Sequence, residues 1–233
     1  MDQELQRRRQ AMESLRNACE QFEANHSLAS IDDGVIELFL TETADIDLEE
    51  SIKLGVVLAL RVLNRLGWDE ASKVYKYVID REPGSPGTYV TWINIGLAMM
   101  SDEKHVFEYR KHIAEDVEQL IKKASNGDDQ WVAGFWGTFY VKHPLRNDKD
   151  ANWLEQAAKW RRIEVDSLRR SAELGPHELC QLADVYRQLG NLDYAARLYT
   201  EALAYDLSEC CENTSAQSIE ERLATCRSVN LEK

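Results

Sequence analysis

The sequence predicts an all-α protein built from antiparallel helices that short loops connect. Only 11 Gly and 4 Pro occur in 233 residues, which leaves little of the turn chemistry that β-hairpins need. Apolar residues recur with helical spacing over most of the chain, and long alternation of apolar and polar residues is scarce. Polar or Gly/Pro breaks divide this pattern into about ten to eleven segments of helical length. We therefore expect one continuous helix-turn-helix array.

The first 50 residues are expected to form N-terminal helices followed by an acidic linker. An apolar stripe runs through the first helix, at Leu5, Met12, Leu15, Cys19 and Phe22. Spacings of seven, three, four and three residues place these side chains on one helix face, which can pack on another helix. We expect this face either to dock on the rest of the chain or to form a homodimer. Acidic residues crowd the linker, where negative charge suits the start of the next helix.

The middle of the chain reads as a series of helices with clear breaks. Helical periodicity stops at Gly67, resumes at residue 69 and breaks again in the Pro/Gly-rich segment 83–87. Two more helices are expected over residues 88–100 and 102–124. A helix over residues 130–142 follows, which is apolar nearly all round and should be a buried central helix. The remaining helices are expected over residues 151–174, 177–189, 192–207 and 216–229.

Residues 176–207 carry the most specific pattern in the chain. Its matching positions are Leu179, Leu182, Ala183, Tyr186, Gly190, Ala195, Tyr199, Ala202 and Leu203. The alanines are small where two helices must approach closely, and Gly190 can adopt the left-handed conformation that ends the first helix. This pattern resembles a tetratricopeptide repeat (TPR). Residues 56–83 resemble a second, weaker unit.

The resemblance implies a TPR-like α-solenoid that forms a single domain over residues 1–233. Its expected parts are the N-terminal helices and acidic linker (1–50), degenerate repeats (51–124), aromatic central helices (125–175), and the clear repeat with a C-terminal capping helix (176–233).

Composition narrows the range of functions. The net charge of −13 opposes nucleic-acid binding, and the basic residues within 159–170 are expected to lie on a solvated helix face. No uncharged run is long enough to span a bilayer, and no apolar leader follows the basic residues near the N-terminus, so we expect a cytoplasmic or nuclear protein. Five Cys without Cys-x-x-Cys spacing argue against a disulfide framework and a zinc site.

No motif indicates catalysis or a cofactor. His105, Glu108 and His112 share a helix but lack a second group of ligands, so we expect no metal site. We therefore expect a non-enzymatic protein-interaction module, an adaptor or scaffold that binds a peptide or a partner helix in a groove. The TPR resemblance places the groove on the first helix of each unit. The candidate residues are Arg61, Asn64, Arg65, His177, Asp184, Arg187 and Gln188.

The Lys/Asn clamp by which chaperone adaptors of the TPR family hold C-terminal carboxylates is absent. Its positions would fall at Val57 and Arg61 and at Cys180 and Asp184. Arg61, Asn64 and Arg65 instead form a polar patch that suits an acidic or phosphorylated peptide.

Two alternatives remain open. Length, acidity and helix order also resemble 14-3-3 proteins, which implies a homodimer that binds phosphopeptides. The Arg-Tyr pair of that family's phosphate clamp would fall near Val141 and Lys142, so the clamp is not carried over. The other alternative is a helical enzyme with its site in the aromatic segment 131–140, near His112 or His143.

Overall fold

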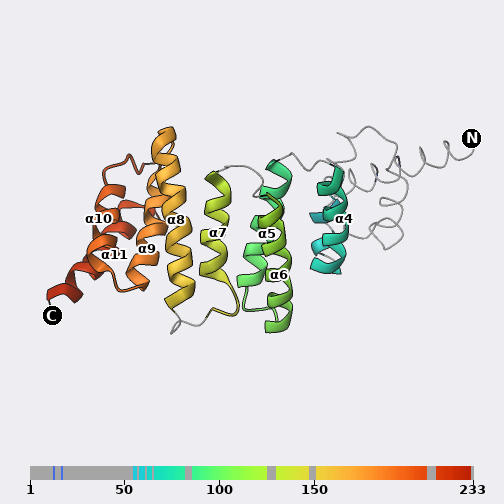
Figure 1. The fold of residues 1–233 in the computed structure, drawn as a ribbon, viewed down its shortest axis with the longest axis horizontal. Coiled ribbons are helices and arrows are strands. Elements are labelled where there is room, and N and C mark those ends of the chain that lie inside the picture. Colours follow the sequence, from blue (N-terminus) through green and yellow to red (C-terminus); the bar gives the residue numbers. More distant parts are fainter. Residues whose placement is uncertain are drawn as a thin grey trace, which may run out of the picture. The chain divides into compact units, whose positions relative to one another are not determined.

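The regular structure of the described residues is entirely helical (Figure 1), which confirms the predicted all-α class. The computed structural model describes Glu13, Asn17, residues 55–81 except 57, 61 and 65, and residues 86–124, 130–146, 151–208 and 214–231. The helices are α4 (Trp68–Arg81), α5 (Pro86–Ser101), α6 (Phe107–Ala124), α7 (Gln130–Lys142), α8 (Ala151–Ser171), α9 (Pro176–Gln188), α10 (Leu192–Ala202) and α11 (Ala216–Leu231).

The predicted count of ten to eleven helices is not reached in the described part of the chain. There, α4 to α11 have both ends defined, and helical residues between 55 and 66 add one more helix. The apolar stripe predicted for the first helix lies outside the described residues. Of its neighbours, Glu13 and Asn17 are described and exposed.

The chain divides into two compact units, Met1–Trp92 and Ile93–Lys233, and their boundary falls within α5. The core of the first unit is aromatic. Trp92 stacks on Trp68 with ring centroids 4.7 Å apart and on Tyr75 at 4.2 Å. Gly67 has a φ of 90°, which breaks the helical pattern just before α4 as the sequence predicts.

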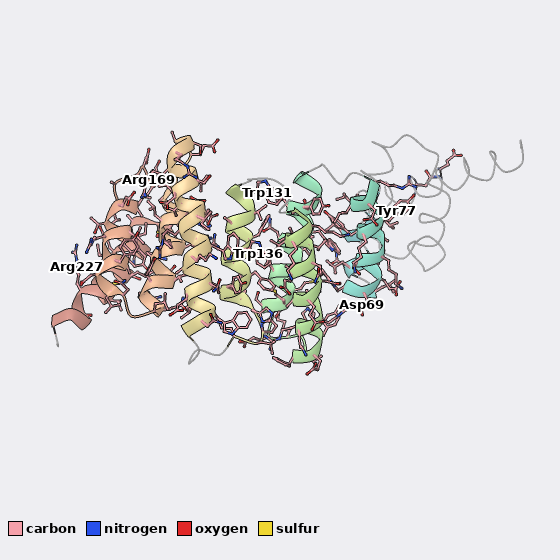
Figure 2. The ribbon with its side chains drawn as sticks, in the orientation of Figure 1. Asp69, Tyr77, Trp131, Trp136, Arg169 and Arg227 are labelled. Carbon is pink, nitrogen blue, oxygen red and sulfur yellow. The ribbon has the colours of Figure 1, made fainter. Side chains whose placement is uncertain are left out.

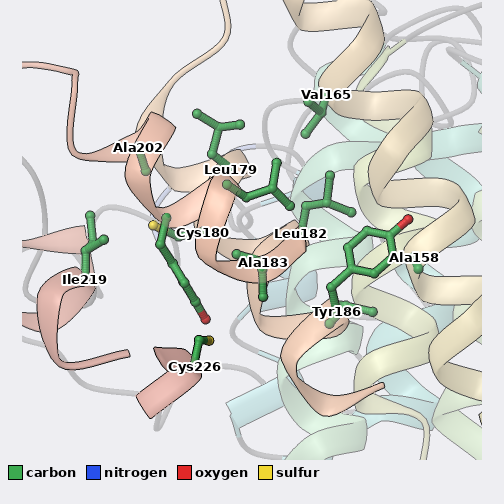
Figure 3. Packing of buried hydrophobic residues seen from close by; sticks show 14 of the residues in the cluster. Ala158, Val165, Leu179, Cys180, Leu182, Ala183, Tyr186, Ala202, Ile219 and Cys226 are labelled. Carbon is green, nitrogen blue, oxygen red and sulfur yellow. The ribbon is translucent and has the colours of Figure 1, made fainter. Parts of the chain in front are cut away.

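In the second unit, helices that follow one another along the chain pack on one another. Residue contacts join α6 to α7, α7 to α8, α8 to α9, α9 to α10 and α10 to α11. Figure 3 shows the core around α9, where Leu179, Leu182 and Ala183 lie between side chains of α8 on one side and of α10 and α11 on the other. α9 and α10 pack on each other, and the three alanines predicted to allow their close approach, Ala183, Ala195 and Ala202, are fully buried.

The turn between α9 and α10 follows from two adjacent residues. Gly190 has a φ of 78°, which confirms its predicted left-handed conformation. The Gly190 N–H donates to the carbonyl of Arg187 at 3.1 Å, and the Asn191 N–H donates to the carbonyl of Tyr186 at 2.9 Å. The Asn191 side chain then accepts from the backbone N–H of Tyr194 at 3.3 Å, which caps the start of α10. Gly190 therefore ends one helix and Asn191 begins the next.

Three predicted helix ends are wrong. α8 ends at Ser171 rather than at residue 174 because Ala172 adopts a left-handed φ of 59°. The sequence has no glycine at this position that would have predicted the helix end. α6 begins at Phe107 rather than at residue 102, since the Asp102 carboxylate accepts from the N–H of Lys104 at 3.0 Å and forms a turn. α10 ends at Ala202 rather than at residue 207. There the backbone N–H groups of Ala204 and Tyr205 donate to carbonyls three residues earlier, as in the tightened last turn of a helix.

Candidate binding groove

A groove of about 570 Å³ lies in the second unit, among residues of α7, α8, α9 and α11. Four of the predicted binding residues line it: His177, Asp184, Arg187 and Gln188. The other lining residues are Thr138, Val141, Lys142, Arg161, Cys180, Gln181, Val185, Thr214, Ser218 and Arg222.

The sequence of α9 supplies one wall of the groove. His177, Gln181, Asp184 and Arg187 follow at intervals of four, three and three residues, so they share one helix face. Another face of the same helix carries Leu179, Leu182, Ala183 and Tyr186, which are buried in the core. The apolar face therefore fixes the direction in which the polar face points.

Asp184 connects three elements at the centre of this wall. Its Oδ1 accepts from the hydroxyl of Tyr199 on α10 at 2.5 Å, and its Oδ2 accepts from Nη1 of Arg222 on α11 at 2.9 Å. Nη2 of Arg187 lies 3.6 Å from Oδ1. Burial raises the pKa of Tyr199, and the Asp184 carboxylate raises this pKa further. The phenol therefore stays protonated and donates to Asp184.

Arg222 is held in place by its own helix as well. Its Nε donates to the carbonyl of Ser218 at 3.1 Å, and its guanidinium lies 5.4 Å from the centre of the Tyr199 ring. The side chain is 20 % exposed, so the guanidinium is fixed but still reaches the groove.

Arg161 and Glu164 form a buried ion pair where α8 meets α7. Nη1 of Arg161 lies 2.6 Å from Oε2 of Glu164, and Nη2 donates to the hydroxyl of Thr138. The predicted solvated position of Arg161 is therefore wrong, since the residue is only 5 % exposed. Burial raises the pKa of the Glu164 carboxyl, although the Arg161 charge opposes this rise.

Two glycines of α7 make room for this ion pair. A Cβ added at Gly137 would lie 2.7 Å from Nε of Arg161, and one added at Gly134 would lie 2.2 Å from Oε1 of Glu164. Both distances are too short for real contacts, so a larger residue at either position would force a shift: of the flexible carboxylate end of Glu164 at Gly134, and of the stem of Arg161 at Gly137. In the sequence, the feature that could have predicted the close packing of α8 on α7 is the pair Gly134 and Gly137 among large aromatic residues.

Most of the charged residues that line the groove in the described part of the chain are basic. Arg187, Arg222 and Lys142 stand there with one described carboxylate, that of Asp184. Arg161 also lines it but is paired with Glu164. Cations therefore outnumber carboxylates among the described lining residues, in a chain whose net charge is −13.

Of the remaining predicted binding residues, Asn64 is exposed in the first unit and does not line this groove. Arg61 and Arg65 lie outside the described residues. Lys142, Arg161 and Arg222 line the groove but were not predicted, because their helices carry no repeat pattern that marks them.

The aromatic segment of α7 is largely buried, as predicted for a central helix. Trp136, whose place on α7 Figure 2 shows, packs against Phe139 with centroids 5.6 Å apart and against Trp160 of α8 at 5.9 Å. Tyr140 lies 5.8 Å from Trp153. Trp153 in turn stacks on His143 with centroids 4.5 Å apart.

His105, Glu108 and His112 belong to no metal-binding cluster among the described residues. His105 packs edge-on against Tyr109, and the described residues hold no group of three or more His, Cys, Asp or Glu side chains that could bind a metal ion. In the same part of the chain, no helix is both long and apolar enough to cross a membrane. The chain matches no protein-family model and no curated protein to which it was compared.

Replacing Asp184 by asparagine is expected to lower the free energy of unfolding by about 2 kcal/mol, because charge-assisted hydrogen bonds from α10 and α11 are weakened together. Urea denaturation followed by circular dichroism measures this change. Glu155→Gln is the control, since it removes an exposed carboxylate from α8 outside the groove. Equal stability of the two variants would show that Asp184 does not tie the helices together.

Proposed function

We propose that this chain is a non-enzymatic protein-interaction module, an adaptor or scaffold whose TPR-like helical array binds a peptide or a partner helix in the groove described above. The observation that carries this proposal is the groove itself. It has about 570 Å³ of space, within the range of small binding sites. Its α9 wall contains the residues that the TPR resemblance marks for ligand contact.

The arrangement of the wall supports binding rather than only structural stability. His177 and Gln181 lie side by side on the polar face of α9, with 2.6 Å between His177 Nε2 and Gln181 Nε2. His177 is exposed. Side chains held in place before a ligand arrives lose little entropy on binding, which favours affinity.

The test is selection of 12-residue peptides from a random display library on the full-length chain. Enriched peptides are synthesised, and their affinity is measured by fluorescence anisotropy. Gln181→Trp should weaken binding by about tenfold or more, because an indole would fill the space that a ligand side chain occupies.

Gln119→Trp is the matched control, since Gln119 is exposed on α6 and does not line the groove. It should leave the affinity unchanged, and thermal melts should show that both variants fold. The proposal fails if no peptide is enriched, or if the enriched peptides bind the Gln181→Trp variant as tightly as the original chain.

A further inference from the structure

We infer that the groove selects acidic peptide segments, in which Asp or Glu side chains pair with Arg187, Arg222 and Lys142. This inference rests on the proposed function and names the chemistry of its ligand. Three features of the described lining support it: its excess of cations, the long contact that leaves the Arg187 guanidinium loosely paired, and the lack of a carboxylate partner for Lys142 among the described residues.

The first feature is the set of charged residues that line the groove. Among the described lining residues, the Asp184 carboxylate lies near two guanidiniums, those of Arg187 and Arg222. A carboxylate brought by a ligand would add negative charge to this cationic lining. Such a ligand would be repelled by most of a chain with a net charge of −13, so the cationic groove would also direct it to this place.

The second feature is the loose pairing of the Arg187 guanidinium. Its Nε is buried and has no hydrogen-bond partner among the described residues, and its contact with Asp184 is long, at 3.6 Å. Buried donors are normally paired, and a guanidinium binds a carboxylate through two parallel hydrogen bonds. The Arg187 side chain is 35 % exposed, so a ligand carboxylate can pair with the open end of its guanidinium, whereas the same charge would repel a basic side chain.

Lys142 extends the positive charge to the end of α7. Its side chain is exposed, it lines the groove, and no ion pair joins it to a carboxylate of the described residues. It stands on a different helix from Arg187 and Arg222, so a bound segment can meet cations from several helices. The spread favours a peptide with more than one acidic side chain over a single small anion.

The experiment uses the peptides selected by display on the full-length chain. They should be enriched in Asp and Glu relative to the unselected library. A version of the best peptide with each Glu replaced by Gln and each Asp by Asn should bind at least about tenfold more weakly at low salt. Raising the salt concentration should reduce this difference, because screening weakens exposed charge pairs.

Lys142→Glu tests the site with little effect on the fold, because the exposed side chain makes no ion pair with the described residues. It should weaken binding of the acidic peptide by about fivefold or more. Arg197→Glu is the matched control, because it makes the same change of charge at an exposed position of α10 outside the groove. Arg197→Glu should change the affinity by less than about twofold.

The outcomes separate this inference from the proposed function. Neutral or basic peptides that lose affinity for the Gln181→Trp variant would support a peptide groove and overturn its acidic preference. Equal weakening by Lys142→Glu and Arg197→Glu would overturn the assignment of the cations. Selective binding of a phosphoserine version over the unmodified acidic peptide would overturn the preference for Asp and Glu. Enrichment of no peptide would remove the proposed function and this inference together.

Discussion

Replacing Arg161 by alanine is expected to lower the free energy of unfolding by about 3–5 kcal/mol, the usual cost of breaking a buried ion pair from one side. Glu164, whose side chain is 12 % exposed, would keep its charge but lose its partner at 2.6 Å. Thr138 would also lose the guanidinium that donates to its hydroxyl. Urea denaturation at neutral pH measures the effect.

The double variant Arg161→Ala/Glu164→Gln should recover part of this loss, because no buried charge remains unpaired. Lys159→Ala is the control on the same helix, since Lys159 is exposed. A loss of less than about 1 kcal/mol for Arg161→Ala would mean that the ion pair does not hold α8 against α7.

The pH dependence gives a second readout of the same change. The folded-state pKa of Glu164 is raised above its ordinary value of 4.5, mainly by burial. The folded state therefore favours the protonated carboxyl. The stability that Glu164 contributes is fully present below pH 4.5, its ordinary pKa, and is lost as the pH rises through its raised folded-state pKa. Removing Arg161 removes the charge that opposes this rise. The stability deficit of Arg161→Ala should thus grow from acid to neutral pH, and the double variant should lack this growth.

Gly137→Ala is expected to lower the free energy of unfolding by about 2 kcal/mol, as overpacking does in dense interiors. At most helical positions the same change stabilises by about 0.5–1 kcal/mol. Here the new Cβ would lie 2.8 Å from Cγ and Cδ of Arg161. These atoms cannot swing away easily, because Thr138 and Glu164 hold the end of the side chain. Thermal and urea denaturation test the sign.

The matched control places Gly137→Ala in the Arg161→Ala/Glu164→Gln background. With the obstructing side chain removed, the substitution should become neutral or stabilising, and the difference between backgrounds measures the contact. Gly134→Ala should cost less, because its Cβ meets the carboxylate end of Glu164 rather than the stem of an arginine. If Gly137→Ala stabilises both backgrounds, α8 does not approach α7 as closely as described.

Sequence reasoning predicted the helical class and the α9–α10 turn because both depend on local signals. Gly190 and Asn191 are adjacent, and each acts through backbone groups a few residues away. The same reasoning misplaced the end of α8, since Ala172 adopts a conformation that its own chemistry disfavours. Four of the residues that line the groove were predicted because the TPR resemblance marks their positions on α9.

The sequence by itself determined where most helices form and which face of α9 is polar, because periodicity and turn residues act over one or two turns. Tertiary structure alone decided that Arg161 is buried and that Arg222 joins Asp184. These contacts link residues 23 and 38 positions apart. The residues next to an arginine in a helix do not show whether its side chain faces water or packs against glycines of another helix. Only the packing of α8 against α7, and of α11 beside α9, distinguishes the two environments.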